Sequence, residues 1–113
     1  MAFTVNTELT SAGIAKVTLV GELDASSAGV FRAEIEKLAN LDTKRLVLLV
    51  RELSYIASAG IRVLVFAKQK MGGSVDIYVV APQEQILETF EMTGLQNSVV
   101  IMKRYDAAKI EKL

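Results

Sequence analysis

Ser58 is the residue whose type and surroundings most directly suggest chemistry. It stands in Ala57-Ser58-Ala59-Gly60, between an apolar run of strand length and a segment with helical spacing. A serine at a helix start can cap the first turn, because its hydroxyl accepts a hydrogen bond from a free backbone N–H. The positive end of the helix dipole also tolerates an added phosphate. The local pattern allows a cap or a phosphoacceptor, and by itself it favours the cap.

The chain lacks the residues that most other kinds of catalytic site use. The chain has no Cys and no His, which removes thiol nucleophiles and the commonest general base and metal ligand. Ser58 is not in the glycine-serine-glycine elbow of a hydrolase, and no glycine-rich loop with lysine is present to bind a nucleotide phosphate. Glu84, Glu88 and Glu91 have helical spacing, which indicates a solvated face. We therefore expect no enzyme, no catalytic residues, no metal and no cofactor.

Length and composition indicate one domain with its own core. The chain has 113 residues, of which 51% are hydrophobic. The charges of its 13 basic and 13 acidic residues cancel, so the formal net charge is zero. This balance gives no electrostatic reason to expect binding to nucleic acid or to an anionic membrane. The first residues lack a signal-peptide pattern, and no apolar run approaches the roughly 20 residues of a membrane span. We expect a single cytoplasmic domain spanning residues 1–113.

Hydrophobic periodicity places the elements that must position Ser58. The run from Leu46 to Val50 is apolar without alternation, which is typical of a strand buried on both faces. Alternating strands and helices indicate a largely parallel sheet, and a short first connection adds an antiparallel hairpin. We expect an α/β fold with a mixed sheet of four or five strands and about four helices. The strands are expected at residues 3–9, 14–20, 46–50, 75–80 and 99–102, and the helices at 28–39, 58–71, 82–94 and 106–113.

Two helices allow more specific predictions. Residues Ile61, Leu64 and Val65 recur at helical spacing after Ser58, so we expect this helix to pack through them. Asp106 is expected to cap the last helix, since aspartate is a favoured N-cap residue.

In this order of elements, the segments GELDASS and LSYIASAGIRVL resemble two motifs of the STAS domain, and more narrowly of the stand-alone bacterial anti-sigma-factor antagonists. GELDASS, residues 21–27, is similar to the family's segment after the second strand. LSYIASAGIRVL, residues 53–64, is similar to its signature loop and helix start. The glycines at 72–73 and the segment MTGL at 92–95 also fall where the family has a glycine turn and a late helix end. The resemblance covers nearly the whole chain and implies the STAS fold.

What the resemblance implies is a protein–protein switch. The unphosphorylated antagonist binds an anti-sigma factor, which is often also a serine kinase, and so releases a sigma factor. Phosphorylation of the serine that matches Ser58 ends the complex, and a metal-dependent serine phosphatase restores it. With this resemblance, the phosphoacceptor interpretation of Ser58 is favoured over the cap alone. Many members carry Asp where this chain has Ala57 and Ser or Thr where it has Ala59, so Ser58 is the only hydroxyl at this helix start.

Six residues are candidates for a partner-binding surface around the phosphorylation site: Asp24, Tyr55, Ala57, Ala59, Gly60 and Arg62. Asp24 could position Ser58 or contact a kinase, and it could equally cap the helix at 28–39, as could Ser26 or Ser27. Arg62 could pair with a phosphate or a partner carboxylate, or be a solvated helix residue.

One alternative to the phosphorylation switch remains open. The chain could be a constitutive STAS scaffold or an interaction subunit of a larger signalling or transport assembly, in which Ser58 is only a cap. A cognate kinase separates the two hypotheses. In either case we expect a monomer or a weak dimer.

Overall fold

The computed structural model describes residues 2–112, which form six strands, four α-helices and one 3₁₀ turn. The predicted α/β class, with a mixed sheet and four helices in one domain, is confirmed. The strands are β1 (Thr4–Leu9), β2 (Ile14–Leu23), β3 (Arg45–Leu49), β4 (Leu53–Ile56), β5 (Asp76–Val80) and β6 (Val100–Met102). The helices are α1 (Ala28–Ala39), α2 (Ser58–Met71), α3 (Glu84–Thr93) and α4 (Ala107–Ile110), and the turn is η1 (Leu95–Asn97).

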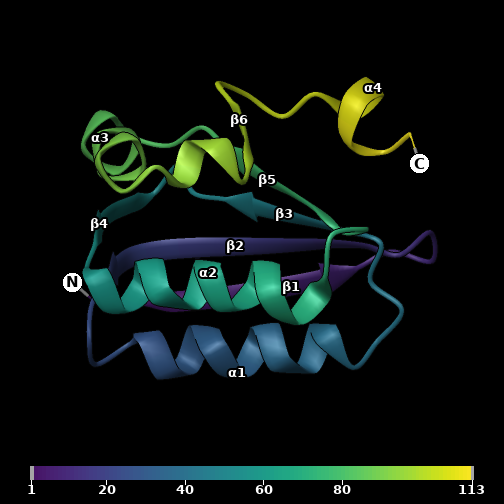
Figure 1. Ribbon diagram of the computed structural model, residues 1–113, viewed down its shortest axis with the longest axis horizontal. Helices are drawn as coiled ribbons and strands as arrows, with labels where there is room; N and C mark the ends of the chain where they lie inside the picture. The colour runs from purple at the N-terminus through teal and green to yellow at the C-terminus, as the bar shows by residue number, and fades with distance from the viewer. Residues whose placement is uncertain (1, 113) are drawn as a thin grey trace.

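The main sheet has the strand order β1-β2-β3-β5-β6 (Figure 1). The strand β1 pairs with β2 in antiparallel fashion, as predicted for a hairpin, and all other pairs are parallel. The strand β3 lies between β2 and β5, so the prediction of a central strand at Leu46 to Val50 is confirmed. Figure 1 shows α1 and α2 side by side along β2.

The strand β4 was not predicted, and it raises the number of strands to six. It pairs in parallel with the second half of β2, where Leu23 is opposite Ile56. The first half of β2 pairs with β3, and the change of partner coincides with an irregularity between Gly21 and Glu22. A four-residue strand is too short to show a clear period, and its partner lies about 30 residues earlier in the chain. This pairing explains why a segment expected to be loop is ordered.

Gly21 is the glycine that the bend in β2 requires. Its φ of +97° is a backbone conformation that residues with a side chain rarely adopt. A Cβ at this position would lie 2.1 Å from the carbonyl oxygen of Ala2, so the space is closed as well. The glycine of GELDASS is therefore explained by backbone geometry.

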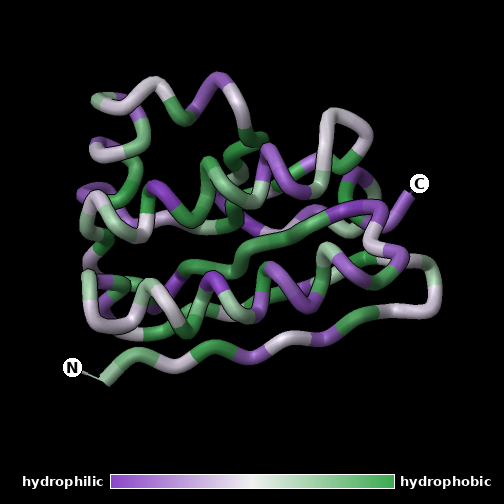
Figure 2. The backbone as a smooth tube through the Cα atoms, turned by 60° about the horizontal axis from the view of Figure 1, so that its bottom comes forward, coloured by the Kyte–Doolittle hydropathy of each residue, from purple (hydrophilic) through white to green (hydrophobic). Residues whose placement is uncertain are grey.

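Buried side chains form two clusters, one on each face of the sheet. Because successive strand residues point to opposite faces, neighbours such as Val47 and Leu48 enter different clusters. The larger cluster lies under α1, α2 and α3, and the smaller one is closed by Ile110 of α4. Figure 2 shows hydrophobic and hydrophilic residues alternating along the helices, as expected for elements with one buried side.

One residue of α2 that was predicted to pack against the core is exposed. Ile61 and Leu64 are buried as expected, together with Val63, but Val65 is 41% exposed. At about 100° per residue, the buried stripe spans the directions of Val63, Leu64 and Ile61, and Val65 falls roughly 40° beyond it. Helical spacing from Ile61 was therefore not sufficient to place Val65 in the core.

Candidate functional site

The ends of β2 and β4 bring Asp24 and Ser58 to the same edge of the sheet. The N–H of Ala57 donates to the carbonyl oxygen of Leu23 at 2.8 Å, directly after the pairing of Leu23 with Ile56. Because the two strands are parallel, the residues that follow them leave at the carboxyl edge, where open α/β sheets commonly carry their sites. Strand pairing thus places Asp24 and Ser58 at the same edge of the sheet, although they are far apart in the sequence.

Gly60 allows α2 to begin close against these two strands. A Cβ at this position would lie 2.8 Å from Cγ of Leu23 and 3.0 Å from Cγ1 of Ile56. The N–H groups of Gly60 and Ile61 both donate to the carbonyl oxygen of Ala57, at 2.9 and 3.1 Å, which closes the first turn. Gly60 is buried. Of the six candidate surface residues, we therefore assign Gly60 to packing beneath the surface.

The hydroxyl of Ser58 is exposed and does not cap α2. The helix begins at Ser58, so the capping position is occupied by Ala57, whose side chain has no acceptor. Within residues 2–112 the Ser58 side chain has no hydrogen-bond partner, and the N–H groups of Ser58 and Ala59 have no backbone acceptor. A cap must stand one residue before the first helical residue, so the predicted cap is wrong by one position.

Asp24 organises the turn between β2 and α1. Its Oδ1 accepts hydrogen bonds from Ser26 Oγ at 2.8 Å, Ser26 N at 3.0 Å and Ser27 N at 3.1 Å. The hydroxyls of Ser26 and then Ser27 hold the pKa of the Asp24 carboxyl below its ordinary value. No hydrogen bond joins this carboxylate to Ser58 among the described residues. Of the two roles considered for Asp24, the geometry supports the local, turn-forming one.

Ser27 is the buried hydroxyl of this turn. Its Oγ donates to the carbonyl oxygen of Glu22 at 2.9 Å and accepts from the N–H of Asp24 at 2.9 Å. It occupies the N-cap position of α1 without making a side-chain cap bond. Ser27 therefore ties the end of β2 to the start of α1.

A shallow groove of about 280 Å³ lies between β4 and α3. The side chain of Gln85 donates to the carbonyl oxygen of Ser54, and Gln83 Nε2 donates to that of Arg51 at 3.0 Å, so α3 is held against β4 and the turn before it. Tyr55 is 50% exposed and Met92 86% exposed at the groove. Sequence analysis singled out Tyr55 but missed the groove, because its second wall comes from a helix about 30 residues further along the chain.

The outer side of α3 is acidic. Glu84, Glu88 and Glu91 are exposed, as predicted for a solvated face, and Glu88 also lines the groove. In the described part of the chain none of these three carboxylates is in an ion pair. The groove therefore combines apolar side chains with one lining carboxylate, that of Glu88.

The remaining candidate residues surround Ser58 on α2. Ala57 and Ala59 are half-buried on either side of it, and Ala59 packs against the core. Arg62 is exposed one turn further along the helix and forms no ion pair with any described residue. Small side chains next to Ser58 leave its hydroxyl accessible to another protein.

Residues 2–112 contain neither a group of metal-ligand side chains nor a membrane-spanning helix. No three His, Cys, Asp or Glu side chains are grouped so that they could hold a metal ion. None of the helices described is both long and apolar enough to cross a membrane.

The sequence of this chain matches a known family model. The model of the STAS domain matches residues 8–108, which include both motifs described above. No curated protein matches this sequence significantly.

Several solved structures share the fold. An anti-sigma factor antagonist from Mycobacterium paratuberculosis is similar with a TM-score of 0.87 and 20% identity, over 98% of this chain and 96% of the other. SpoIIAA in its unphosphorylated form has a TM-score of 0.77 and 15% identity, over 96% of both chains. The phosphorylated form of the Bacillus protein SpoIIAA has a TM-score of 0.74 and 16% identity, over 96% of this chain and 98% of the other. At these identities the likeness shows a common fold.

Proposed function

Because this chain belongs to the STAS domain family, we propose that it is an anti-sigma-factor antagonist whose binding surface surrounds Ser58. In its unphosphorylated form it binds an anti-sigma factor that is also a serine kinase, and so releases a sigma factor. Phosphorylation of Ser58 by that kinase ends the complex, and a serine phosphatase restores it. Two observations support this role. The structural neighbours from Mycobacterium paratuberculosis and Bacillus are anti-sigma factor antagonists, and SpoIIAA exists in both phosphorylated and unphosphorylated forms.

The observation that carries the proposal is the unused hydroxyl of Ser58. A kinase must reach a serine oxygen, and this one is exposed at the first residue of α2 with no hydrogen-bond partner in residues 2–112. The adjacent free N–H groups and the positive end of the helix dipole favour an anion there by about 0.3–1 kcal/mol. The protein can therefore accept a phosphate without unfolding.

Phosphorylation would act on the complex by local exclusion. A phosphate adds roughly 1.5 to 2 negative charges at neutral pH. A partner that covers Ser58 must then desolvate this charge or place its own groups against it, and an unpaired buried charge is far more costly than an exposed one. The carboxylate of Glu88 lines the groove beside Tyr55, so this part of the proposed surface already carries a negative group. We therefore expect the antagonist to keep its shape and to lose its partner.

The partner surface we propose extends from Ser58 to the groove between β4 and α3. Tyr55 and Met92 offer exposed apolar area, and Arg62 offers an exposed cation on the same helix as Ser58. Aromatic and arginine side chains are frequent anchors of protein interfaces. Asp24 contributes by holding the turn that ends β2.

The test combines phosphorylation with binding. The chain is incubated with its candidate kinase and ATP, and intact mass with site mapping is expected to place one phosphate on Ser58. Ser58→Ala is expected to bind the anti-sigma factor and to take no phosphate, and Ser58→Glu is expected to stay folded and to bind poorly. Ser74→Glu, at an exposed serine in the turn after α2, is the matched control and is expected to bind like the wild type.

Two results would contradict the proposal in different ways. A Ser58→Glu protein that melts like the wild type and still binds at full strength would remove the switching mechanism. A partner that stays fully bound after incubation with the kinase and ATP, with no phosphate placed on Ser58, would instead favour the alternative, a constitutive interaction subunit.

A further inference from the structure

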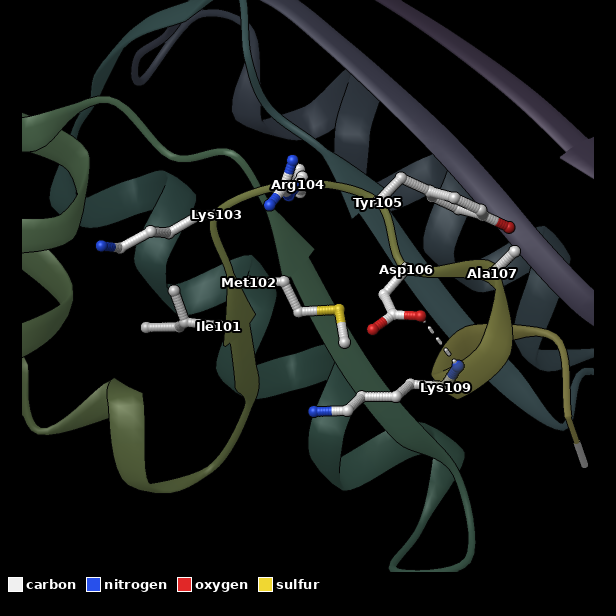
Figure 3. Close-up of a pocket in the computed structure, with 8 residues that line it drawn as sticks. All are labelled: Ile101, Met102, Lys103, Arg104, Tyr105, Asp106, Ala107 and Lys109. Atoms are coloured by element: carbon white, nitrogen blue, oxygen red, sulfur yellow. Dashed lines mark hydrogen bonds between the residues drawn. The ribbon is translucent and has the colours of Figure 1, made fainter.

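A second surface hollow, of about 390 Å³, lies where the chain leaves β6 and turns back toward α4 (Figure 3). Its lining comes from residues 101–109, and Figure 3 shows the side chains of Lys103, Arg104 and Lys109 spread around Met102 and Asp106. In the strand order, β3 and β5 separate β6 from β2, whose end leads to Asp24 beside the Ser58 site. The hollow is therefore not part of the surface proposed for the anti-sigma factor.

The hollow has an excess of positive charge. Lys103, Arg104 and Lys109 are exposed, and none of them has an ion pair within residues 2–112. The single carboxylate in the lining, Asp106, uses its Oδ1 to accept from the N–H groups of Ala108 and Lys109 at 3.1 and 3.3 Å. Three positive and one negative side chain leave a local charge of +2, in a chain whose total charge is zero.

These free cations differ from several other basic residues of the protein. Four basic side chains elsewhere contact a carboxylate at 2.9 to 3.5 Å: Lys16, Lys37, Lys44 and Arg45. An unneutralised group of three cations around one hollow attracts anions from solution, and Arg and Lys are the usual ligands of phosphate and carboxylate groups.

The shape of the hollow is held by contacts outside it. Tyr105 donates a hydrogen bond to Glu111, and Lys16 of β2 lies 5.1 Å from the centre of the Tyr105 ring. Arg45 donates to the carbonyl oxygen of Ile110 at 2.9 Å, and Ile110 is fully buried. Both ends of the curved segment are thus fixed to the sheet, so a ligand would not need to order it.

We propose that this hollow binds a small organic polyanion of metabolite size, whose phosphate or carboxylate groups contact Lys103, Arg104 and Lys109. Half-buried Met102, whose side chain points toward Asp106 and Lys109 in Figure 3, supplies an apolar contact for the organic part of the ligand. The volume lies in the lower part of the range of about 300–1,000 Å³ that is usual for small-molecule sites. This site goes beyond the proposed function and does not depend on it.

The experiment is a titration of the ¹⁵N-labelled full chain followed by amide chemical shifts. ADP represents phosphate ligands and citrate represents carboxylate ligands, each added at low ionic strength. At least one of them is expected to cause saturable shifts concentrated in residues 101–109. Lys103→Gln combined with Lys109→Gln is expected to weaken binding at least about fivefold. Lys70→Gln, at an exposed lysine at the end of α2, is the matched control and is expected to bind like the wild type.

The same titrations can also contradict the proposed site. The proposal fails if neither probe causes saturable shifts, or if the double variant and the Lys70→Gln control respond like the wild type. The melting temperatures of both variants are measured first. If the double variant melts early, Arg104→Gln replaces it, and an unchanged affinity in that protein also overturns the proposal.

Discussion

Two serines near the carboxyl edge of β2 and β4 have opposite surroundings. Ser27 is buried and its hydroxyl both donates and accepts a hydrogen bond, while Ser58 is exposed and its hydroxyl does neither in the described residues. Removing a buried hydroxyl leaves its hydrogen-bond partners unsatisfied. Removing an exposed hydroxyl costs little, because water can hydrogen-bond to any group it had contacted. The two positions should therefore respond differently to the same substitution.

We predict that Ser58→Ala changes the free energy of unfolding by no more than about 0.5 kcal/mol, because no hydrogen bond of the hydroxyl is lost. Ser27→Ala is predicted to lower it by about 1–3 kcal/mol, because Glu22 and Asp24 lose a buried partner. Urea denaturation of both proteins checks the difference. A loss of about 1 kcal/mol or more in Ser58→Ala would mean that the hydroxyl caps α2 after all.

Asp24 should make stability depend on acid pH. Its pKa in the folded protein is lowered by the Ser26 and Ser27 hydroxyls, so its contribution is present above the unfolded pKa and is lost as pH falls through the folded one. We predict that Asp24→Asn is less stable than the wild type at neutral pH and that the gap narrows below about pH 4. Urea denaturation across this pH range measures the gap. Profiles that stay parallel down to acid unfolding would contradict the assignment.

At the scale of elements, the start of α2 depends on its close approach to β2 and β4. Gly60→Ala is predicted to lower the free energy of unfolding by about 1–3 kcal/mol, because the new Cβ would meet Leu23 and Ile56 at 3.0 Å or less. Gly29→Ala in α1 is the matched control, since a Cβ there meets nothing within 4 Å. Its stability is predicted to stay the same or to rise by up to about 1 kcal/mol. The same gain in both proteins would show that helix propensity, and not contact with Leu23 and Ile56, controls position 60.

At the scale of the whole molecule, Arg45 connects the beginning of β3 to the C-terminal end of the described chain. Its Nη1 donates to the carbonyl oxygens of Lys109, Ile110 and Lys112, at 2.9, 2.9 and 3.2 Å. A helix of four residues has little stability of its own, so α4 depends on these bonds and on the burial of Ile110. The second face of the sheet is thereby closed by a contact between residues more than 60 positions apart.

We predict that Arg45→Ala lowers the free energy of unfolding by about 1.5–3 kcal/mol and speeds hydrogen exchange in α4. Lys44→Ala is the control, because its ion pair with Asp42 is exposed and such pairs contribute about 0–1 kcal/mol. Denaturation and amide exchange at Ile110 check both. Unchanged exchange in Arg45→Ala would show that apolar burial alone holds α4.

Much of the fold follows from patterns that are local in the sequence. The unbroken apolar run of β3 predicted a central strand, helical spacing predicted the burial of Ile61 and Leu64, and the acceptance of two N–H groups by Asp106 confirms its predicted cap. The position of Ser58 at a strand-to-helix junction could also be predicted. These properties depend on a few neighbouring residues, whose side chains the strand or helix period places on a given face.

Other properties of the site depend on residues that only the folded chain brings together. The strand β4 exists because the second half of β2 pairs with it, and the groove at Tyr55 exists because α3 packs beside it. Because α2 begins at Ser58, this serine is not its cap and has no hydrogen-bond partner among residues 2–112. Val65 is exposed because it lies beyond the side of α2 that packs on the core. The periodicity of hydrophobic residues contains no information about which distant segments will pair. Tertiary packing therefore determined these features, and they could not be predicted from the sequence alone.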